Sequence, residues 1–145
     1  MQEDINLTPI SIDASVFISA IGVKDIFSPD SRSFFTCLSP RQPVILPILV
    51  VAETVVTLSR QKADSGNKAF TYLERFDIVH LDMPYLKKII SSSSGKKLKT
   101  SDFIIAATAK LYKATLITWD KQLLSSANTI CKAITPKQFV ATRNS

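Results

Sequence analysis

Four carboxylates in this sequence stand among apolar neighbours, where an unpaired charge is unfavourable. They are Asp13, Glu53, Asp102 and Asp120. Most of the remaining acidic residues lie in polar or turn-like surroundings and need no special explanation. A carboxylate against apolar surface is costly unless it is hydrogen-bonded, paired with a base or bound to a metal. These four residues are therefore the candidates for chemistry.

The positions of the four acids follow from the elements that we expect around them. Asp13 and Asp120 come after short β-branched segments that are typical of buried strands. Asp102 lies in the first turn of an expected helix, before an apolar run. Glu53 lies within an apolar helical segment, where its neighbours three and four residues away are mostly apolar.

Each acid also has a simpler explanation that the sequence leaves open. Asp13 and Asp120 could cap the helices that follow them. Asp102 could favour the positive end of its own helix. Glu53 could form an ion pair with a buried lysine or arginine.

Strands and helices alternate along the chain, which indicates an α/β fold in one domain. We expect strands at residues 9–14, 42–46, 77–81, 114–118 and 129–134, and helices at 15–21, 33–38, 47–63, 67–75, 84–90, 101–113 and 120–126. Thr100 is the expected N-cap of the helix at 101–113, and residues 91–95 are expected to form a loop. Such alternation predicts a mostly parallel central sheet of four to five strands between two helical layers.

The expected topology would bring the four acids together. Ligands of open parallel sheets bind at the carboxyl ends of the strands, where Asp13 and Asp120 stand. Four carboxylates in one crevice repel one another, and a divalent cation relieves that repulsion. Ligands that are all oxygen favour Mg²⁺ or Mn²⁺ over zinc. Such a site suits phosphodiester hydrolysis, because the cation polarises the phosphoryl oxygen and activates a bound water.

The charge balance suits a polyanionic partner. The 145 residues include 18 Lys and Arg against 12 Asp and Glu, which gives a net charge of +6. This surplus is consistent with RNA or DNA binding through phosphates, although a solvated basic surface is the simpler alternative. The clustered bases are Lys96, Lys97, Lys99, Lys110, Lys113 and Lys121.

The sequence also excludes several classes of protein. His80 is the only histidine, so a histidine-rich zinc site is excluded, and we expect no catalytic role for His80. Cys37 and Cys131 form no metal-binding pattern and are expected to be reduced thiols. The acidic N-terminal segment does not resemble a secretory signal, and no apolar run is long enough to span a membrane. We therefore expect a cytoplasmic protein.

At the four acids the sequence resembles the PIN-domain family, especially the VapC-type toxins of bacterial toxin–antitoxin pairs. The resemblance covers residues 10 to about 140. It rests on four segments in order: Ser-Ile-Asp-Ala-Ser at 11–15, Val-Ala-Glu-Thr-Val at 51–55, the segment from Leu98 to Ala109 around Asp102, and Leu-Ile-Thr-Trp-Asp-Lys at 116–121. The third is the most specific, because the family has an Asp before a small and apolar helix.

This resemblance implies a PIN-like three-layer α/β/α fold and Mg²⁺- or Mn²⁺-dependent RNA cleavage. It also implies a homodimer and inhibition by a small antitoxin protein. Asp13, Glu53, Asp102 and Asp120 would be the catalytic residues and metal ligands. Ser15 and Thr118 would support them through hydrogen bonds.

Two features depart from the family pattern. Trp119 is bulky where the family often has a polar or small residue; it could shape the substrate entrance or stack on a base, or it could simply pack at the edge of the core. Residues 1–8 precede the first strand and carry no assigned role.

Two alternative functions remain open at this point. The segment from Asp77 to Pro84 is similar to the phosphoacceptor strand of a receiver domain, with Asp82 as the acceptor. That alternative leaves Glu53 and Asp102 unexplained, and Asp13 lacks the second acid that a receiver needs. The chain could also be a catalytically inactive, nucleic-acid-binding protein with a PIN fold.

Overall fold

The computed structural model describes residues 7–93 and 97–143, and five parallel strands form its central sheet in the order β3-β2-β1-β4-β5. The strands are β1 (Ile10–Ile12), β2 (Val44–Pro47), β3 (Asp77–Val79), β4 (Thr115–Ile117) and β5 (Ala133–Ile134). The helices are α1 (Ala14–Ile21), α2 (Ser28–Cys37), α3 (Ile48–Gln61), α4 (Ser65–Leu73), α5 (Met83–Ser92), α6 (Thr100–Leu111), α7 (Lys121–Ala127) and α8 (Pro136–Arg143).

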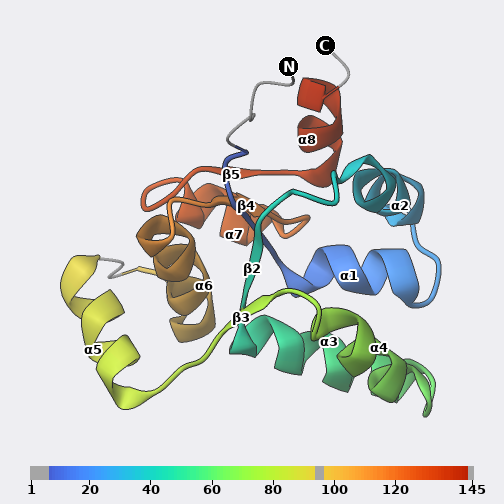
Figure 1. The fold of residues 1–145 in the computed structure, drawn as a ribbon, viewed down its shortest axis with the longest axis horizontal. Helices are drawn as coiled ribbons and strands as arrows, with labels where there is room; N and C mark the ends of the chain where they lie inside the picture. Colours follow the sequence, from blue (N-terminus) through green and yellow to red (C-terminus); the bar gives the residue numbers. More distant parts are fainter. Residues whose placement is uncertain (1–6, 94–96, 144–145) are drawn as a thin grey trace.

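The helices cover both faces of the sheet and make the predicted three-layer α/β/α fold (Figure 1). Helices α1 and α3 lie on one side of β2, and α6 lies on the other. Helix α4 packs on α3, and α5 packs on α6. Helix α8 packs on α2, where the rings of Phe34 and Phe139 meet edge to face at 5.1 Å between centroids.

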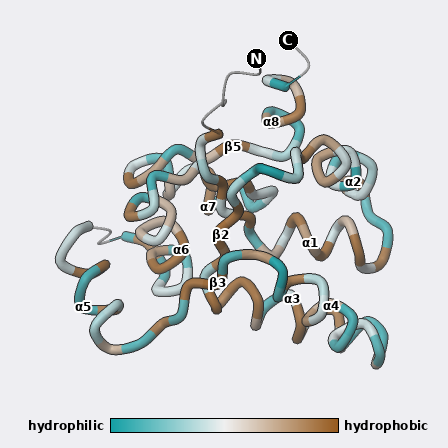
Figure 2. Tube along the Cα trace, in the orientation of Figure 1, coloured by the Kyte–Doolittle hydropathy of each residue, from teal (hydrophilic) through white to brown (hydrophobic). Residues whose placement is uncertain are grey.

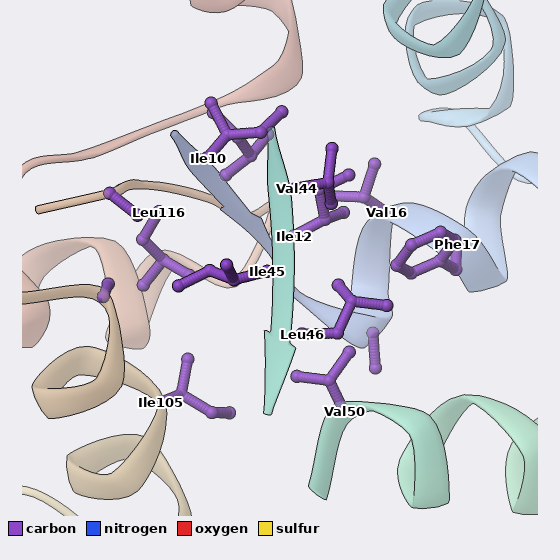
Figure 3. Packing of buried hydrophobic residues seen from close by; sticks show 14 of the residues in the cluster. Ile10, Ile12, Val16, Phe17, Val44, Ile45, Leu46, Val50, Ile105 and Leu116 are labelled. Carbon is purple, nitrogen blue, oxygen red and sulfur yellow. The ribbon is translucent and has the colours of Figure 1, made fainter. Parts of the chain in front are cut away.

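Alternating side chains of β2 supply the two halves of the core (Figure 3). Ile45 points toward Ile105 of α6, whereas Leu46 points toward Val50 of α3. A strand buried on both faces needs apolar residues at successive positions rather than at every second one, and β2 is accordingly hydrophobic from Val44 to Leu46 (Figure 2). The sheet is thereby fixed between two layers that each carry part of the candidate site.

The observed elements agree with the expected ones apart from some boundaries and one helix. Helix α8 was not predicted, and α2 begins earlier than expected, at Ser28. Thr100 does not cap α6: Lys99 occupies the cap position, and no side chain caps the helix. Helix α5 extends to Ser92, into the expected loop, while Ser94 and Gly95 lie outside the described residues.

Two further expectations concern the cysteines and the membrane. Cys37 and Cys131 are both free and half-buried, and burial raises the pKa of the Cys131 thiol to about 11. Within residues 7–93 and 97–143, none of the helices combines the length and the apolar character that a membrane crossing requires.

The two-sided burial of the strands predicts a large cost for truncating a strand side chain. Leu116 of β4 is 0% exposed, so Leu116→Ala is expected to lower the free energy of unfolding by about 2–5 kcal/mol. Leu81, which is 37% exposed, gives the matched control, and Leu81→Ala is expected to cost less than about 1 kcal/mol. Urea denaturation of both variants checks this, and equal losses would contradict the described core.

Candidate acidic site

The register of the sheet brings the first and last of the four acids to the same edge. Strands β1 and β4 are neighbours, with Ile12 opposite Ile117. Asp13 therefore leaves β1 beside Thr118, and the Asp13 amide donates a 2.9 Å hydrogen bond to the carbonyl of Ile117. Asp120 follows two residues after Thr118, at the start of α7.

All four predicted acids line one open cavity of about 390 Å³. Asp13 comes from the end of β1 and Asp120 from the end of β4, whereas Glu53 comes from α3 and Asp102 from the first turn of α6. The cavity therefore draws on both helical layers and on the sheet edge between them. The predicted convergence of the four residues is present in the structure.

Asp13 is the most buried of the four and is held by two hydroxyl groups. Its side chain is 6% exposed, and its Oδ2 accepts hydrogen bonds from Ser15 Oγ and Thr118 Oγ1, both at 2.7 Å. Asp13 occupies the N-cap position of α1 but makes no side-chain cap hydrogen bond, so helix capping does not explain this carboxylate. Oδ1 has no hydrogen-bond partner among the described residues and remains available to a ligand.

Ser15 and Thr118 are in turn oriented by backbone amides of the turn between β4 and α7. The amide of Trp119 donates to Ser15 Oγ at 3.1 Å, and the amide of Asp120 donates to Thr118 Oγ1 at 3.0 Å. Each hydroxyl therefore accepts one N–H and directs its own proton to Asp13. This is the supporting arrangement that the sequence predicted for Ser15 and Thr118.

Asp120 caps α7 and also faces the cavity. Its Oδ1 accepts hydrogen bonds from the amides of Gln122 and Leu123 at 2.9 and 3.1 Å. Its Oδ2 has no such partner in the described part of the chain. The capping explanation is thus correct for one oxygen and leaves the other oxygen free for a ligand.

Glu53 and Asp102 have no hydrogen-bonded or ionic partner among the described residues. Glu53 is exposed rather than buried in the apolar stripe that the sequence suggested, and no lysine or arginine pairs with it. Its pKa is raised by partial desolvation and then by the charges of Asp13, Asp102 and Asp120. The pKa of Asp102 is raised by desolvation and by Asp120, against the opposing charge of Lys99. These mutual effects show that the four carboxylates share one electrostatic environment.

The donor set fits a hard divalent cation, although the side chains are not in a closed coordination shell. Among residues 7–93 and 97–143, no three acidic, histidine or cysteine side chains are close enough together to form a preformed metal site. The available ligands are nevertheless all carboxylate oxygens in a cavity of net negative charge, which is the chemistry that Mg²⁺ and Mn²⁺ prefer. A cation would also offset the carboxylate charges that, after desolvation, contribute to the raised pKa values of Glu53 and Asp102.

Some residues singled out in the sequence lie elsewhere, and one charged residue of the cavity, Lys99, was not recognised as such. Asp82 caps α5 by accepting from the amide of Tyr85 at 2.9 Å, and His80 is exposed after β3; neither lines the acidic cavity. Lys99 does line it, although the sequence identified Lys99 only as part of a basic cluster. The sequence did contain a signal for this position, because Lys99 stands three residues before Asp102 and residues at that spacing on a helix are neighbours.

Comparison with known protein families decides which family this site represents. The family model described as PIN domain matches residues 10–128, a span that includes all four acids. The chain belongs to the PIN-domain family. The resemblance inferred from the four sequence segments is thereby confirmed. No curated protein sequence matches the chain significantly.

Solved structures share the PIN fold at low sequence identity. A toxin–antitoxin complex from Klebsiella pneumoniae is 20% identical over 88% of this chain and 97% of that one, with a TM-score of 0.67. FitAcB from Neisseria gonorrhoeae is 23% identical over 88% of this chain and 97% of its own, with a TM-score of 0.64. VapC20 of Mycobacterium tuberculosis, described as a toxin that cleaves the sarcin–ricin loop, is 13% identical over 81% and 94%, with a TM-score of 0.66.

The raised pKa of Glu53 predicts how the stability of the metal-free PIN domain depends on pH. The pKa of Glu53 is higher in the folded protein than its unfolded value of 4.5, so its ionisation lowers the stability of the folded state. This loss of stability is absent well below pH 4.5 and is complete once the pH has risen above the folded pKa. Glu53→Gln removes this loss of stability. We expect the variant to be more stable than the native protein at pH 7, by less than about 1 kcal/mol because solvent screens the open site.

This difference should shrink toward zero as the pH falls below 4.5. Urea denaturation in EDTA between pH 4 and pH 7 measures it. Glu74→Gln removes an exposed glutamate that does not line the cavity and serves as the matched control. If the native protein is more stable than Glu53→Gln at pH 7, the ionised Glu53 side chain does not destabilise the folded state, and the prediction is wrong.

Proposed function

We propose that this PIN domain is a cytoplasmic, Mg²⁺- or Mn²⁺-dependent endoribonuclease and the toxin of a type II toxin–antitoxin pair. The observation that carries the proposal is the convergence of Asp13, Glu53, Asp102 and Asp120 on one cavity. Family membership supports nuclease chemistry. Hydrolysis at such a site needs neither a histidine nor a covalent nucleophile, which is consistent with an exposed His80 outside the cavity.

Carboxylate oxygens of the four acids would hold the cation. Asp13 Oδ1 and Asp120 Oδ2 are the free oxygens of the two hydrogen-bonded acids, whereas Glu53 and Asp102 reach the cavity from opposite helical layers. When bound, the cation supplies Lewis-acid polarisation of a phosphoryl oxygen and lowers the pKa of a water ligand. Ser15 and Thr118 hold the Asp13 carboxylate in one orientation by donating two hydrogen bonds to it.

RNA is the proposed substrate because the chain combines this acidic cavity with an excess of bases. The net charge is +6 although the cavity itself is acidic, so the surplus lies outside it. Lys99 lines the cavity, and in this proposal its ammonium group would bind a phosphate next to the cleaved bond. Lys97 is exposed two residues before Lys99, and Lys96 lies outside the described residues.

The partner proposal draws on the proteins with similar folds. One of the similar structures is a toxin–antitoxin complex, and another is a toxin that cleaves the sarcin–ricin loop. By analogy we propose that a small antitoxin protein inhibits this chain and that the chain forms a homodimer. The product of the reading frame next to this gene is the candidate antitoxin.

The receiver-domain alternative is not favoured by any observation. Asp82 follows the edge strand β3 and caps α5, away from the acidic cavity. A catalytically inactive PIN-fold binding protein is the remaining alternative, and the cleavage assay below distinguishes it from a nuclease.

Replacing Asp13 is expected to abolish RNA cleavage without unfolding the protein. Changes to residues that only support metal ligands cost about 10–100-fold, so loss of a direct ligand in Asp13→Asn should reduce Mn²⁺-dependent cleavage by about 100-fold or more. Asp82→Asn is the matched control, because asparagine caps helices as well as aspartate does. Cleavage of a labelled RNA, with EDTA as the blank, measures both variants. Equal cleavage by native protein and Asp13→Asn would overturn the nuclease proposal.

The antitoxin proposal has its own test. Co-purification with the small protein encoded next to this gene should give a stable complex in which Mn²⁺-dependent cleavage is inhibited at equimolar ratio. Sedimentation of the free chain reports whether it is a dimer. Cleavage that is unaffected by a saturating amount of that protein would remove it as the partner.

A further inference from the structure

We propose that Trp119 is a positioning residue of the acidic site, which it holds in place through a hydrogen bond to Ser31 of α2. The inference rests on the proposed function, since it concerns the same carboxylates. Trp119 does not line the cavity, and its connection to the acids runs through the residues that it contacts.

The backbone of Trp119 belongs to the network that holds Asp13. The turn between β4 and α7 consists of Thr118, Trp119 and Asp120. The hydroxyl of Thr118 donates to Asp13, and the amide of Trp119 donates to Ser15. Asp120 lines the cavity and has a free carboxylate oxygen. A shift of this short turn would therefore disturb all three at once.

The indole of Trp119 fixes this turn to α2 by two contacts. Its ring stacks on Phe27, with centroids 4.5 Å apart and an angle of 22° between the planes. Its Nε1 donates to Ser31 Oγ at 2.7 Å. Phe27 directly precedes α2 and Ser31 lies in its first turns, so both contacts tie the site to an element that supplies none of the cavity residues.

The partner hydroxyl is itself buried and held in one orientation. Ser31 is 0% exposed and is hydrogen-bonded to Ser19 of α1, which donates to the carbonyl of Val16 at 3.1 Å. Because Ser19 uses its only hydroxyl proton on Val16, Ser31 must donate to Ser19 and can only accept from the indole. The direction of every bond from Trp119 to α1 is thereby determined, and no alternative orientation satisfies all the groups.

A packing role alone would not require this arrangement. Stacking on Phe27 would hold a phenylalanine equally well, whereas the bond to Ser31 needs the indole N–H. Loss of the hydrogen bond from the Trp119 indole to Ser31 releases the turn between β4 and α7 from α2. The variants Ser31→Ala and Trp119→Phe therefore remove the same bond from its two ends, and the phenylalanine keeps an aromatic ring beside Phe27.

Mg²⁺ titration followed by the fluorescence of Trp119, the only tryptophan in the chain, tests the inference in Ser31→Ala. Supporting residues in contact with a metal ligand contribute about 10–100-fold to affinity, and Ser31 acts one contact further out, so the Kd for Mg²⁺ is expected to rise about 3- to 10-fold. The kcat for RNA should fall similarly at fixed Mg²⁺ below saturation, with the KM for RNA unchanged. Ser33→Ala, at an exposed position of the same helix, should leave both values as in the native protein.

Calorimetric titration extends the test to Trp119→Phe, which has lost the fluorophore. Trp119→Phe and the double variant should also bind Mg²⁺ more weakly than the native protein, because both lack the hydrogen bond between Trp119 and Ser31. Ser31→Ala and the double variant lose the bond to Ser19 as well. Native Mg²⁺ affinity in both single variants would overturn the inference, even if urea denaturation showed them to be less stable. If the native protein binds Mg²⁺ but cleaves no RNA, the proposed function is overturned. The Mg²⁺ affinities of the variants would still decide the role of Trp119. Absence of Mg²⁺ binding by the native protein would overturn both.

Discussion

Repulsion among four carboxylates at one edge of a sheet is the constraint on which the rest of this structure depends. The pKa values of Glu53 and Asp102 are raised first by desolvation and then by the charges of neighbouring carboxylates. The fold must supply enough stability elsewhere to hold them together. It does so with strands buried on both faces and with helices that close the two layers around them.

The four acids are not held equally firmly. Asp13 is buried and receives two hydroxyl protons, and Asp120 receives two amide protons. Glu53 and Asp102 have no such partners in the described part of the chain. A hydrogen-bonded pair at the sheet edge thus faces a pair on the helices that lacks such bonds. Under the proposed function, the first pair would present its free oxygens to the cation in fixed directions.

Much of this could be predicted from the sequence, because the signals are local. Asp13 and Asp120 follow apolar β-branched strands, and parallel topology places such residues at one edge. Exposure of Glu53 could not be predicted, since helical spacing gives its neighbours but not the angle at which α3 meets the cavity. Helix α8 was missed although Thr135 and Gln138 form a capping box at its start, which is a local signal. Its packing contact, between Phe139 and the distant Phe34, could not be predicted. The bond between Trp119 and Ser31 likewise joins residues 88 positions apart.

The capping and ligand explanations for these acids looked like alternatives in the sequence, but a carboxylate has two oxygens. Asp120 uses Oδ1 to cap α7 and leaves Oδ2 free, while Asp13 places both hydroxyl bonds on Oδ2 and leaves Oδ1 free. In each case the structural bonds fix the orientation of the group and so aim the unused oxygen. A residue at the end of a strand can therefore stabilise its helix or its neighbours and still present a ligand. Structural and catalytic roles need not compete when they fall on different atoms of one side chain.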